Sequence, residues 1–277
     1  MELKYTKMHG AGNDYIYFDC FDQKIDDPNG LSVKLSDRHK GIGGDGIVLI
    51  LPSKVADAKM RMFNADGSDG KMCGNAIRCV AKFLFDRKRV GTHLTIETLS
   101  GIKTLDVTKV ADGKALEVKV DMGEPILEPK LIPCEFEGDD VIDKLMTIDG
   151  TDYKVTCVSM GNPHVVVFVD DVDNFCVESV GRKFEHHVKF PEGVNTEFVQ
   201  VIDKSHVKMR VWERGSGETM ACGTGACATV VACVLNKKTD RKVEVELLGG
   251  TLCIEYARGT VMMTGPAVEV FDGIVRA

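Results

Sequence analysis

The sequence predicts an α+β protein made of two pseudo-symmetric domains, each a mixed β-sheet or β-roll wrapped around one central helix. Three observations support this fold class. Distinctive residues recur at a fixed separation, the same order of short apolar segments occurs in each half, and each half contains one longer segment that is apolar on nearly all sides. With 277 residues, the chain is long enough for two such domains.

The internal repeat has a spacing of 149 residues (162 − 13). The corresponding segments are Gly12-Asn13 and Gly161-Asn162, Lys59-Met60-Arg61 and Lys208-Met209-Arg210, Cys73-Gly74 and Cys222-Gly223, and Gly101 and Gly250. Unrelated segments would seldom keep one register over a whole domain, so we expect a duplication. We expect an N-terminal domain of residues 1–121 plus 267–277 and a C-terminal domain of residues 122–266, divided near the turn-like Gly123-Glu124-Pro125.

The expected elements follow the same plan in both halves. Residues 75–88 and 224–237 are predicted helices, and because each is apolar nearly all round, each should be enclosed by its own sheet. Alternating or apolar runs predict the strands, which lie at 15–19, 47–51, 59–63, 94–97, 102–107 and 116–120, and again at 165–169, 197–201, 207–212, 243–247, 252–256 and 261–264.

Composition excludes several classes of protein. The net charge of −7 and the pI of about 5.6 give no general attraction to nucleic acid. The N-terminus lacks the apolar core of a secretory signal, and no apolar run approaches the roughly 20 residues of a membrane span. We therefore expect a cytoplasmic protein whose ten cysteines are mostly reduced thiols, and the absence of a CxxC pair argues against a zinc ribbon.

Two of the ten cysteines, Cys73 and Cys222, stand directly before the predicted central helices. Unpaired N–H groups and the positive dipole end at a helix N-terminus stabilise a thiolate and can hold a carboxylate, and Gly74 and Gly223 allow close approach. A carboxylate held between two such helix ends would have one thiol on each face of its α-carbon. Inversion of a stereocentre requires this arrangement, with one group that removes a proton and another that donates one.

Four motifs resemble diaminopimelate epimerase. They are MHGAGNDY (8–15), FNADGSDGKMCGNAIRC (63–79), SMGNPH (159–164) and ERGSGETMACGTGAC (213–227), and the resemblance extends from residue 6 to residue 272. It implies interconversion of LL- and meso-diaminopimelate for lysine and peptidoglycan-precursor synthesis, without pyridoxal phosphate or a metal. It also implies a homodimer of β-roll subunits with the active site in the interdomain cleft.

The resemblance assigns roles to individual residues. Cys73 and Cys222 would be the catalytic pair. The donors to the reacting carboxylate would be Gly74, Asn75, Gly223 and Thr224, and the rest of the substrate would be held by Asn13, Asn64, Asn162, Asn195 and Arg214. Glu213 would meet the distal ammonium, and with His164 it would also tune the thiols. From the residues alone, Asn13 and Asn162 are equally well explained as turn residues and His164 as a structural histidine.

Three features need separate interpretation. Some relatives carry Gln where this chain has Gly46, the repeat partner of Asn195, so a side-chain contact from that position is not expected. The segment 41–46 matches GxGxxG, but it precedes an expected strand rather than a helix, which favours a turn over a nucleotide site. The pair His186-His187 has no further ligand at metal-site spacing and is expected on a solvated face.

Other functions remain open at this point. A proline-racemase-like enzyme would also use two cysteines, although the Asn64, Asn162, Glu213 and Arg214 set favours a substrate with a second charged end. A non-catalytic amino-acid-binding protein could use the helix ends without the thiols. A thiol redox protein could join Cys73 and Cys222 in a disulfide under oxidation.

Overall fold

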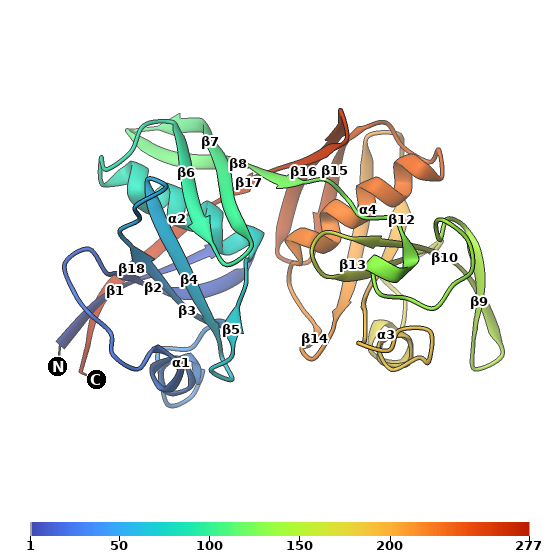
Figure 1. The fold of residues 1–277 in the computed structure, drawn as a ribbon, viewed down its shortest axis with the longest axis horizontal. Coiled ribbons are helices and arrows are strands. Elements are labelled where there is room, and N and C mark those ends of the chain that lie inside the picture. Colours follow the sequence, from blue (N-terminus) through green and yellow to red (C-terminus); the bar gives the residue numbers. More distant parts are fainter. Residues whose placement is uncertain (1, 277) are drawn as a thin grey trace. The chain divides into compact units, whose positions relative to one another are not determined.

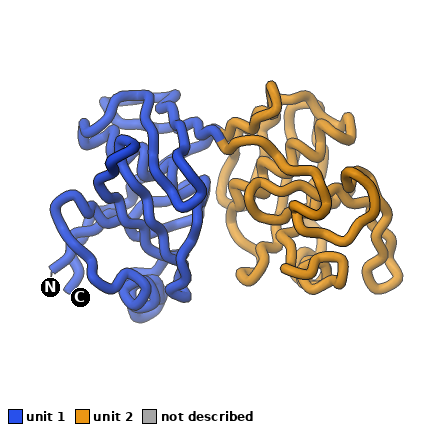
Figure 2. The backbone as a smooth tube through the Cα atoms, viewed as in Figure 1, with its two compact units in different colours: residues 1–121, 264–277 blue, residues 122–263 orange. Residues whose placement is uncertain are grey.

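The computed structural model describes residues 2–276 and divides the chain into two compact units. Unit 1 comprises residues 1–121 and 264–277, and unit 2 comprises residues 122–263 (Figure 2). The sequence-based division has the same first boundary and places the return to the first domain at residue 267, three residues later than the contacts do.

Unit 1 is built on one mixed sheet (Figure 1). Its elements are β1 (Glu2–Gly10), β2 (Asn13–Asp19), α1 (Pro28–Ser36), β3 (Gly46–Leu51), β4 (Ala58–Asn64), β5 (Asp69–Gly70), α2 (Gly74–Asp86), β6 (His93–Thr98), β7 (Gly101–Ala111), β8 (Lys114–Gly123) and β18 (Val268–Arg276). The pairing runs β18–β1–β2–β3–β4–β6–β7–β8, in which β2–β3 and β4–β6 are parallel and the other pairs antiparallel.

Unit 2 repeats this plan. Its elements are η1 (Pro129–Leu131), β9 (Lys144–Ile148), β10 (Thr151–Ser159), β11 (Pro163–Phe168), α3 (Val177–Glu185), β12 (Asn195–Val201), β13 (His206–Glu213), β14 (Gly217–Glu218), α4 (Gly223–Leu235), β15 (Lys242–Leu247), β16 (Gly250–Ala257) and β17 (Thr260–Pro266). The order β9–β10–β11–β12–β13–β15–β16 has its parallel pairs at β11–β12 and β13–β15. These are the repeat counterparts of the parallel pairs in unit 1, so the duplication extends to sheet topology.

The central helices α2 and α4 are buried almost all round, as the sequence predicted. They begin one residue before and end two residues before the predicted limits. Even the long cations of α2 are enclosed. Arg78 donates to the carbonyl oxygens of Gly74 (3.1 Å) and Pro266 (3.3 Å), and Lys82 forms an ion pair with Asp86 (2.7 Å). Such partners are what allow charged groups to be buried.

Helices α1 and α3 were not predicted from the sequence. They occupy equivalent places, since Val177–Glu185 lies one repeat after Pro28–Ser36. The start of α1 carried a recognisable signal, because Asp27 accepts a capping hydrogen bond from the Gly30 N–H (3.0 Å) and proline stands at the first helical position. No helix within residues 2–276 is long and apolar enough to cross a lipid bilayer.

Each unit has a hydrophobic core of its own. In unit 1, strand residues such as Ile16, Phe18 and Ile47 pack against Leu31 and Leu35 of α1. In unit 2, a larger cluster centres on Phe198, whose ring lies 4.5 Å from Phe175 and 6.3 Å from Phe184 between centroids, and Trp212 packs against this cluster. The single tryptophan of the chain therefore reports on the packing of unit 2.

Replacing Phe198 by alanine is expected to lower the free energy of unfolding of unit 2 by about 3–5 kcal/mol, because a fully buried ring leaves a cavity among closely packed aromatics. Urea unfolding followed by Trp212 fluorescence measures the effect. Leu145→Ala is the control: that side chain is exposed, so its loss should change stability by about 0.5 kcal/mol or less. Equal midpoints for the two variants would contradict the assignment of Phe198 to the centre of this core.

Candidate active site

The two predicted catalytic cysteines occupy the same structural position in the two units. Cys73 is the N-cap residue of α2 and Cys222 the N-cap residue of α4, both with extended backbone. Neither makes a side-chain capping hydrogen bond. Since the first N–H groups of a helix have no intrahelical acceptor, both helix ends are suited to an anionic ligand that accepts these hydrogen bonds.

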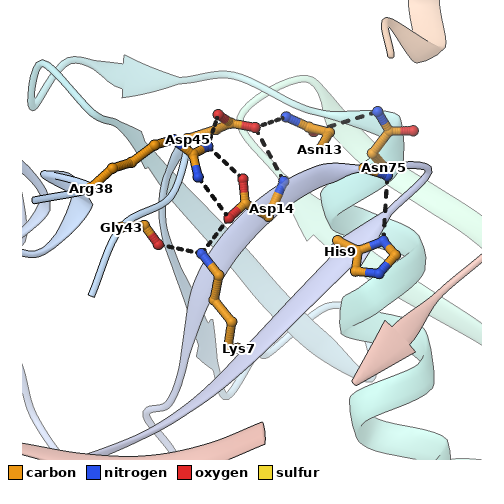
Figure 3. A network of polar contacts seen from close by, with 9 residues as sticks. Lys7, His9, Asn13, Asp14, Arg38, Gly43, Asp45 and Asn75 are labelled. Carbon is orange, nitrogen blue, oxygen red and sulfur yellow. Dashed lines mark hydrogen bonds and ion pairs between the residues drawn. The ribbon is translucent and has the colours of Figure 1, made fainter. Parts of the chain in front are cut away.

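In unit 1, Asn13 and Asn75 gather around Cys73. The Cys73 Sγ lies 3.3 Å from Asn13 Oδ1. The Asn75 side-chain amide donates to the same oxygen at 3.4 Å, a contact that Figure 3 shows. Asn75 and Gly74 are buried in the first turn of α2. Asn64, by contrast, donates to the Ser68 hydroxyl (3.0 Å) in the turn between β4 and β5.

A charged network behind Asn13 holds its side chain in place (Figure 3). The Asn13 amide donates to Asp45 Oδ2 at 2.6 Å, and Arg38 bonds both Asp45 (3.0 Å) and Asp14 (2.7 Å). Lys7 also pairs with Asp14. Because the Asn13 nitrogen is committed to a carboxylate, its oxygen is directed toward Cys73. This network was not predicted from the sequence: Asp14 and Asp45 lie within the segments 8–15 and 41–46, but the contacts join two strands and a loop and depend on tertiary structure.

The Asp14 carboxylate remains ionised within this network. Burial opposes its charge, but hydrogen bonds and charges from Arg38 and Lys7 outweigh burial and lower the pKa of Asp14 below its usual value.

In unit 2, Cys222 is only 6% exposed, and its Sγ lies 3.5 Å from the Thr224 hydroxyl. Burial raises the pKa of Cys222 well above its usual value, and the negative charges of Glu213 and Glu197 raise it further. The Thr224 hydroxyl and the Gly225 N–H lower it only in part. Desolvation and two nearby carboxylates therefore oppose the stabilisation that the helix end gives to a Cys222 thiolate.

His164 is part of a buried pair with Glu197, a residue that the sequence analysis did not single out. The His164 Nδ1 lies 2.7 Å from Glu197 Oε1, its Nε2 lies 3.0 Å from Asn162 Oδ1, and both His164 and Glu197 are 0% exposed. The two come from the parallel strands β11 and β12. The sequence offered no clear signal, because a glutamate among the polar and apolar residues of a predicted strand is ordinarily interpreted as facing solvent.

The side chains of His164, Glu197 and Cys222 also offer three ligand types that metals accept, with donor atoms within 4.8 Å of one another. A tetrahedral zinc with bonds of about 2.0 Å would hold two such ligands about 3.3 Å apart. The 2.7 Å between His164 and Glu197 is a hydrogen-bond distance instead. We therefore treat the group as a hydrogen-bonded acid/base cluster.

The remaining substrate candidates of unit 2 lie at the end of β13. Glu213 accepts a short hydrogen bond from the Thr219 hydroxyl. The Arg214 side chain is exposed and donates to the Glu192 carbonyl (2.8 Å), while its backbone N–H donates to Asn195 Oδ1 (3.0 Å). Asn195 is buried and also donates to the Pro163 carbonyl (2.7 Å), so it joins β11, β12 and the Arg214 backbone. Gly223 is buried and Thr224 half-buried in the first turn of α4.

The structure agrees with the interpretation of the remaining motifs. The GxGxxG segment is a loop that leads into β3 at Gly46, with no helix after it. Of the histidine pair, His186 is exposed and His187 half-buried. Gly46 has a φ of +155°, and a Cβ there would collide with the Phe63 carbonyl oxygen. In this chain, a side chain at position 46 would therefore collide with the β4 backbone.

Comparison with solved structures places this fold in a known class. A hydroxyproline epimerase from Agrobacterium vitis with bound trans-4-hydroxy-L-proline superposes with a TM-score of 0.70 at 15% identity, over 99% of this chain and 91% of that one. A probable proline racemase from Agrobacterium radiobacter K84 gives 0.71 at 15% identity, over 99% and 92%. At this identity the likeness establishes a shared two-domain α+β fold.

Sequence comparison then identifies the family. Residues 5–128 and 156–270 match the diaminopimelate epimerase family. The chain is 57% identical over 276 residues to the diaminopimelate epimerase of Acetivibrio thermocellus, which covers 99% of this chain and 98% of that one. It is 57% identical over 274 residues to that of Methanococcus maripaludis strain S2, covering 98% and 99%. The chain belongs to the diaminopimelate epimerase family and is therefore an isomerase that acts on an amino-acid stereocentre.

The Gly46→Ala substitution is expected to lower the melting temperature by several degrees, because the added Cβ meets the β4 backbone at a position where φ is also unfavourable. Gly101→Ala separates the two effects. Its φ of +91° is also unfavourable to a side chain, but its Cβ meets nothing within 4 Å. Thermal unfolding should therefore show the larger loss for Gly46→Ala. If Gly101→Ala lowered the melting temperature as much as Gly46→Ala, backbone strain and not the collision would be the reason that position 46 requires glycine.

Proposed function

We propose that this protein interconverts LL- and meso-diaminopimelate, with Cys73 and Cys222 as the two acid/base groups that act on opposite faces of the same α-carbon. The observation that carries the proposal is that each cysteine caps the N-terminus of the buried central helix of its own unit, at equivalent positions of a duplicated fold. Family membership supplies the substrate.

The helix ends are assigned to the carboxylate at the reacting centre. Backbone N–H groups in the first turns, at Gly74 and Asn75 in unit 1 and at Gly223 and Thr224 in unit 2, would donate to it. These donors withdraw charge from the carboxylate as the α-proton leaves. They therefore stabilise the carbanion-like transition state more than the bound substrate.

The proton transfers balance without an added reactant. The thiolate of one cysteine removes the α-proton as the Cα–H bond breaks, and an S–H bond forms. The thiol of the other cysteine gives its proton to the opposite face of the same carbon. The negative charge passes from the first thiolate to the carbanion-like substrate and then to the second cysteine, so the two cysteines exchange protonation states with each turnover. No cofactor takes part in these steps.

The second amino-acid end of diaminopimelate is assigned chiefly to Glu213 and Arg214, whose repeat counterparts Asn64 and Ala65 carry no charge. Glu213 would bind the distal ammonium, and the exposed guanidinium of Arg214 would bind the distal carboxylate bidentately. Asn13, Asn64 and Asn162 would complete the contacts. Asn195 would act through Arg214, to whose N–H it is bonded at 3.0 Å. A proline ring has no distal charges, so these residues favour diaminopimelate over a racemase substrate.

We further propose a homodimer that works in the cytoplasm.

The proposal is tested by incubating the reduced protein with LL-diaminopimelate in D₂O. The expected products are the meso isomer and deuterium at the inverted α-carbon, seen by mass spectrometry and chiral separation. Absence of both from a folded, reduced sample would rule out the epimerase. A disulfide-linked Cys73–Cys222 peptide without any exchange would favour the redox alternative, and binding without exchange the non-catalytic one.

Each of Cys73→Ala and Cys222→Ala is expected to lower kcat by at least about 100-fold, since either change removes one of two required proton-transfer groups. Steady-state kinetics measures the loss. Cys176→Ala is the matched control, because Cys176 also caps a helix of unit 2, α3, but is exposed and lies outside the proposed half-sites. Near-normal turnover in either of the first two variants would refute the two-base assignment.

A further inference from the structure

The two half-sites are not electrostatically equivalent. Unit 2 places the buried His164–Glu197 pair beside its cysteine, with 2.7 Å between Nδ1 and Oε1. The repeat counterparts in unit 1 are Tyr15 and Val48, which also lie on paired parallel strands and are buried. Neither can supply a carboxylate. The buried carboxylate beside Cys222 therefore has no repeat counterpart in unit 1.

The Glu197 carboxylate reaches Cys222 because residue 225 is glycine. A Cβ at Gly225 would lie 2.6 Å from Glu197 Oε1 and 3.3 Å from Cys222 Sγ, so the missing side chain leaves the space in which carboxylate and thiol approach each other. The repeat counterpart of Gly225 is Ala76, which does have a Cβ. The first turn of α4 is thus shaped for the carboxylate, and the first turn of α2 is not.

The groups that face Glu197 leave part of its charge uncompensated. One oxygen, Oε1, meets the His164 ring, whereas Oε2 is buried without a hydrogen-bond partner. The other titratable groups close by are thiols and one carboxylate. Glu197 raises the pKa values of Cys157 and Cys222, and Glu213 also acts on Cys222. A second negative charge in this poorly solvated region is unfavourable.

We propose that Glu197, held by His164, is a positioning residue that keeps the proton on Cys222 while the site is empty, so that unit 2 supplies the proton donor of the resting enzyme. This proposal deepens the proposed function. Only the role of Cys222 as proton donor to the substrate depends on that function. The protonation of Cys222 itself needs no substrate and no turnover. After one turnover Cys222 is left as the thiolate, and the cluster then favours its reprotonation.

The test is the pH dependence of alkylation of each thiol in the reduced, substrate-free protein, with a chelator present. Short iodoacetamide pulses over a pH series, followed by peptide mass spectrometry, give separate rates for Cys222 and Cys73, because only the thiolate reacts. In the wild-type protein the Cys222 profile should lie at higher pH than the Cys73 profile. A Cys222 profile at lower pH than that of Cys73 would overturn the proposal without any variant.

Glu197→Gln keeps the shape and removes the charge. We expect the midpoint of the Cys222 alkylation profile to move to lower pH by about one unit. At a fixed pH below the midpoint, this shift makes alkylation of Cys222 roughly tenfold faster. The Cys73 profile should stay unchanged. Glu197→Asp restores the charge and should move the profile back toward the wild type. Glu246→Gln, which removes an exposed carboxylate of the same unit, should move neither profile.

An unchanged Cys222 profile in a folded Glu197→Gln protein, with Trp212 fluorescence like the wild type, would contradict the proposal. Equal shifts at Cys73 and Cys222 would also contradict it, because they would reflect a general change in the protein. Neither outcome bears on epimerisation, which the D₂O experiment decides independently.

Discussion

The burial of one helix inside each sheet is the constraint on which the site depends. A helix enclosed in this way must have its first N–H groups satisfied, and the cysteines at the caps of α2 and α4 do not do so with their side chains. A substrate carboxylate can accept those hydrogen bonds. Under the proposed function, the same capping residue carries the thiol that would act on the adjacent α-carbon, so anion binding and proton transfer would have one structural origin in each unit.

The duplication explains both what the halves share and where they differ. They share the parallel strand pairs, the four helices at equivalent positions and the capping cysteines. The proposed inversion needs similar groups on both faces of the carbon, and the shared cysteines would supply them. They differ behind the thiols. Asn13 in unit 1 is fixed by a surface network of Asp45, Asp14 and Arg38, whereas unit 2 has the buried pair of His164 and Glu197. A reaction that removes a proton from one face and delivers a different proton to the opposite face can use such an imbalance.

Much of this could be read from the sequence, because the repeat and the apolar helices are local patterns. The central helices were predicted to within two residues, and the capping positions of Cys73 and Cys222 followed from them. The shorter helices α1 and α3 were missed, although Asp27-Pro28 carries a start signal. Glu197 could not be found, because its burial beside His164 depends on the pairing of β11 with β12 and on the space at Gly225. The raised pKa of Cys222 is likewise a consequence of tertiary burial.

The central claim is that two separate groups act on opposite faces, and the timing of isotope incorporation tests it most directly. Pure LL-diaminopimelate is converted in D₂O to a small extent, and the deuterium content of recovered substrate and of new meso product is measured separately. Two bases predict meso product that is deuterated at the inverted carbon from its first appearance, while recovered LL substrate is still protonated. Early meso product that retains the original hydrogen would contradict the account, since it would mean that one group removes and returns the same proton.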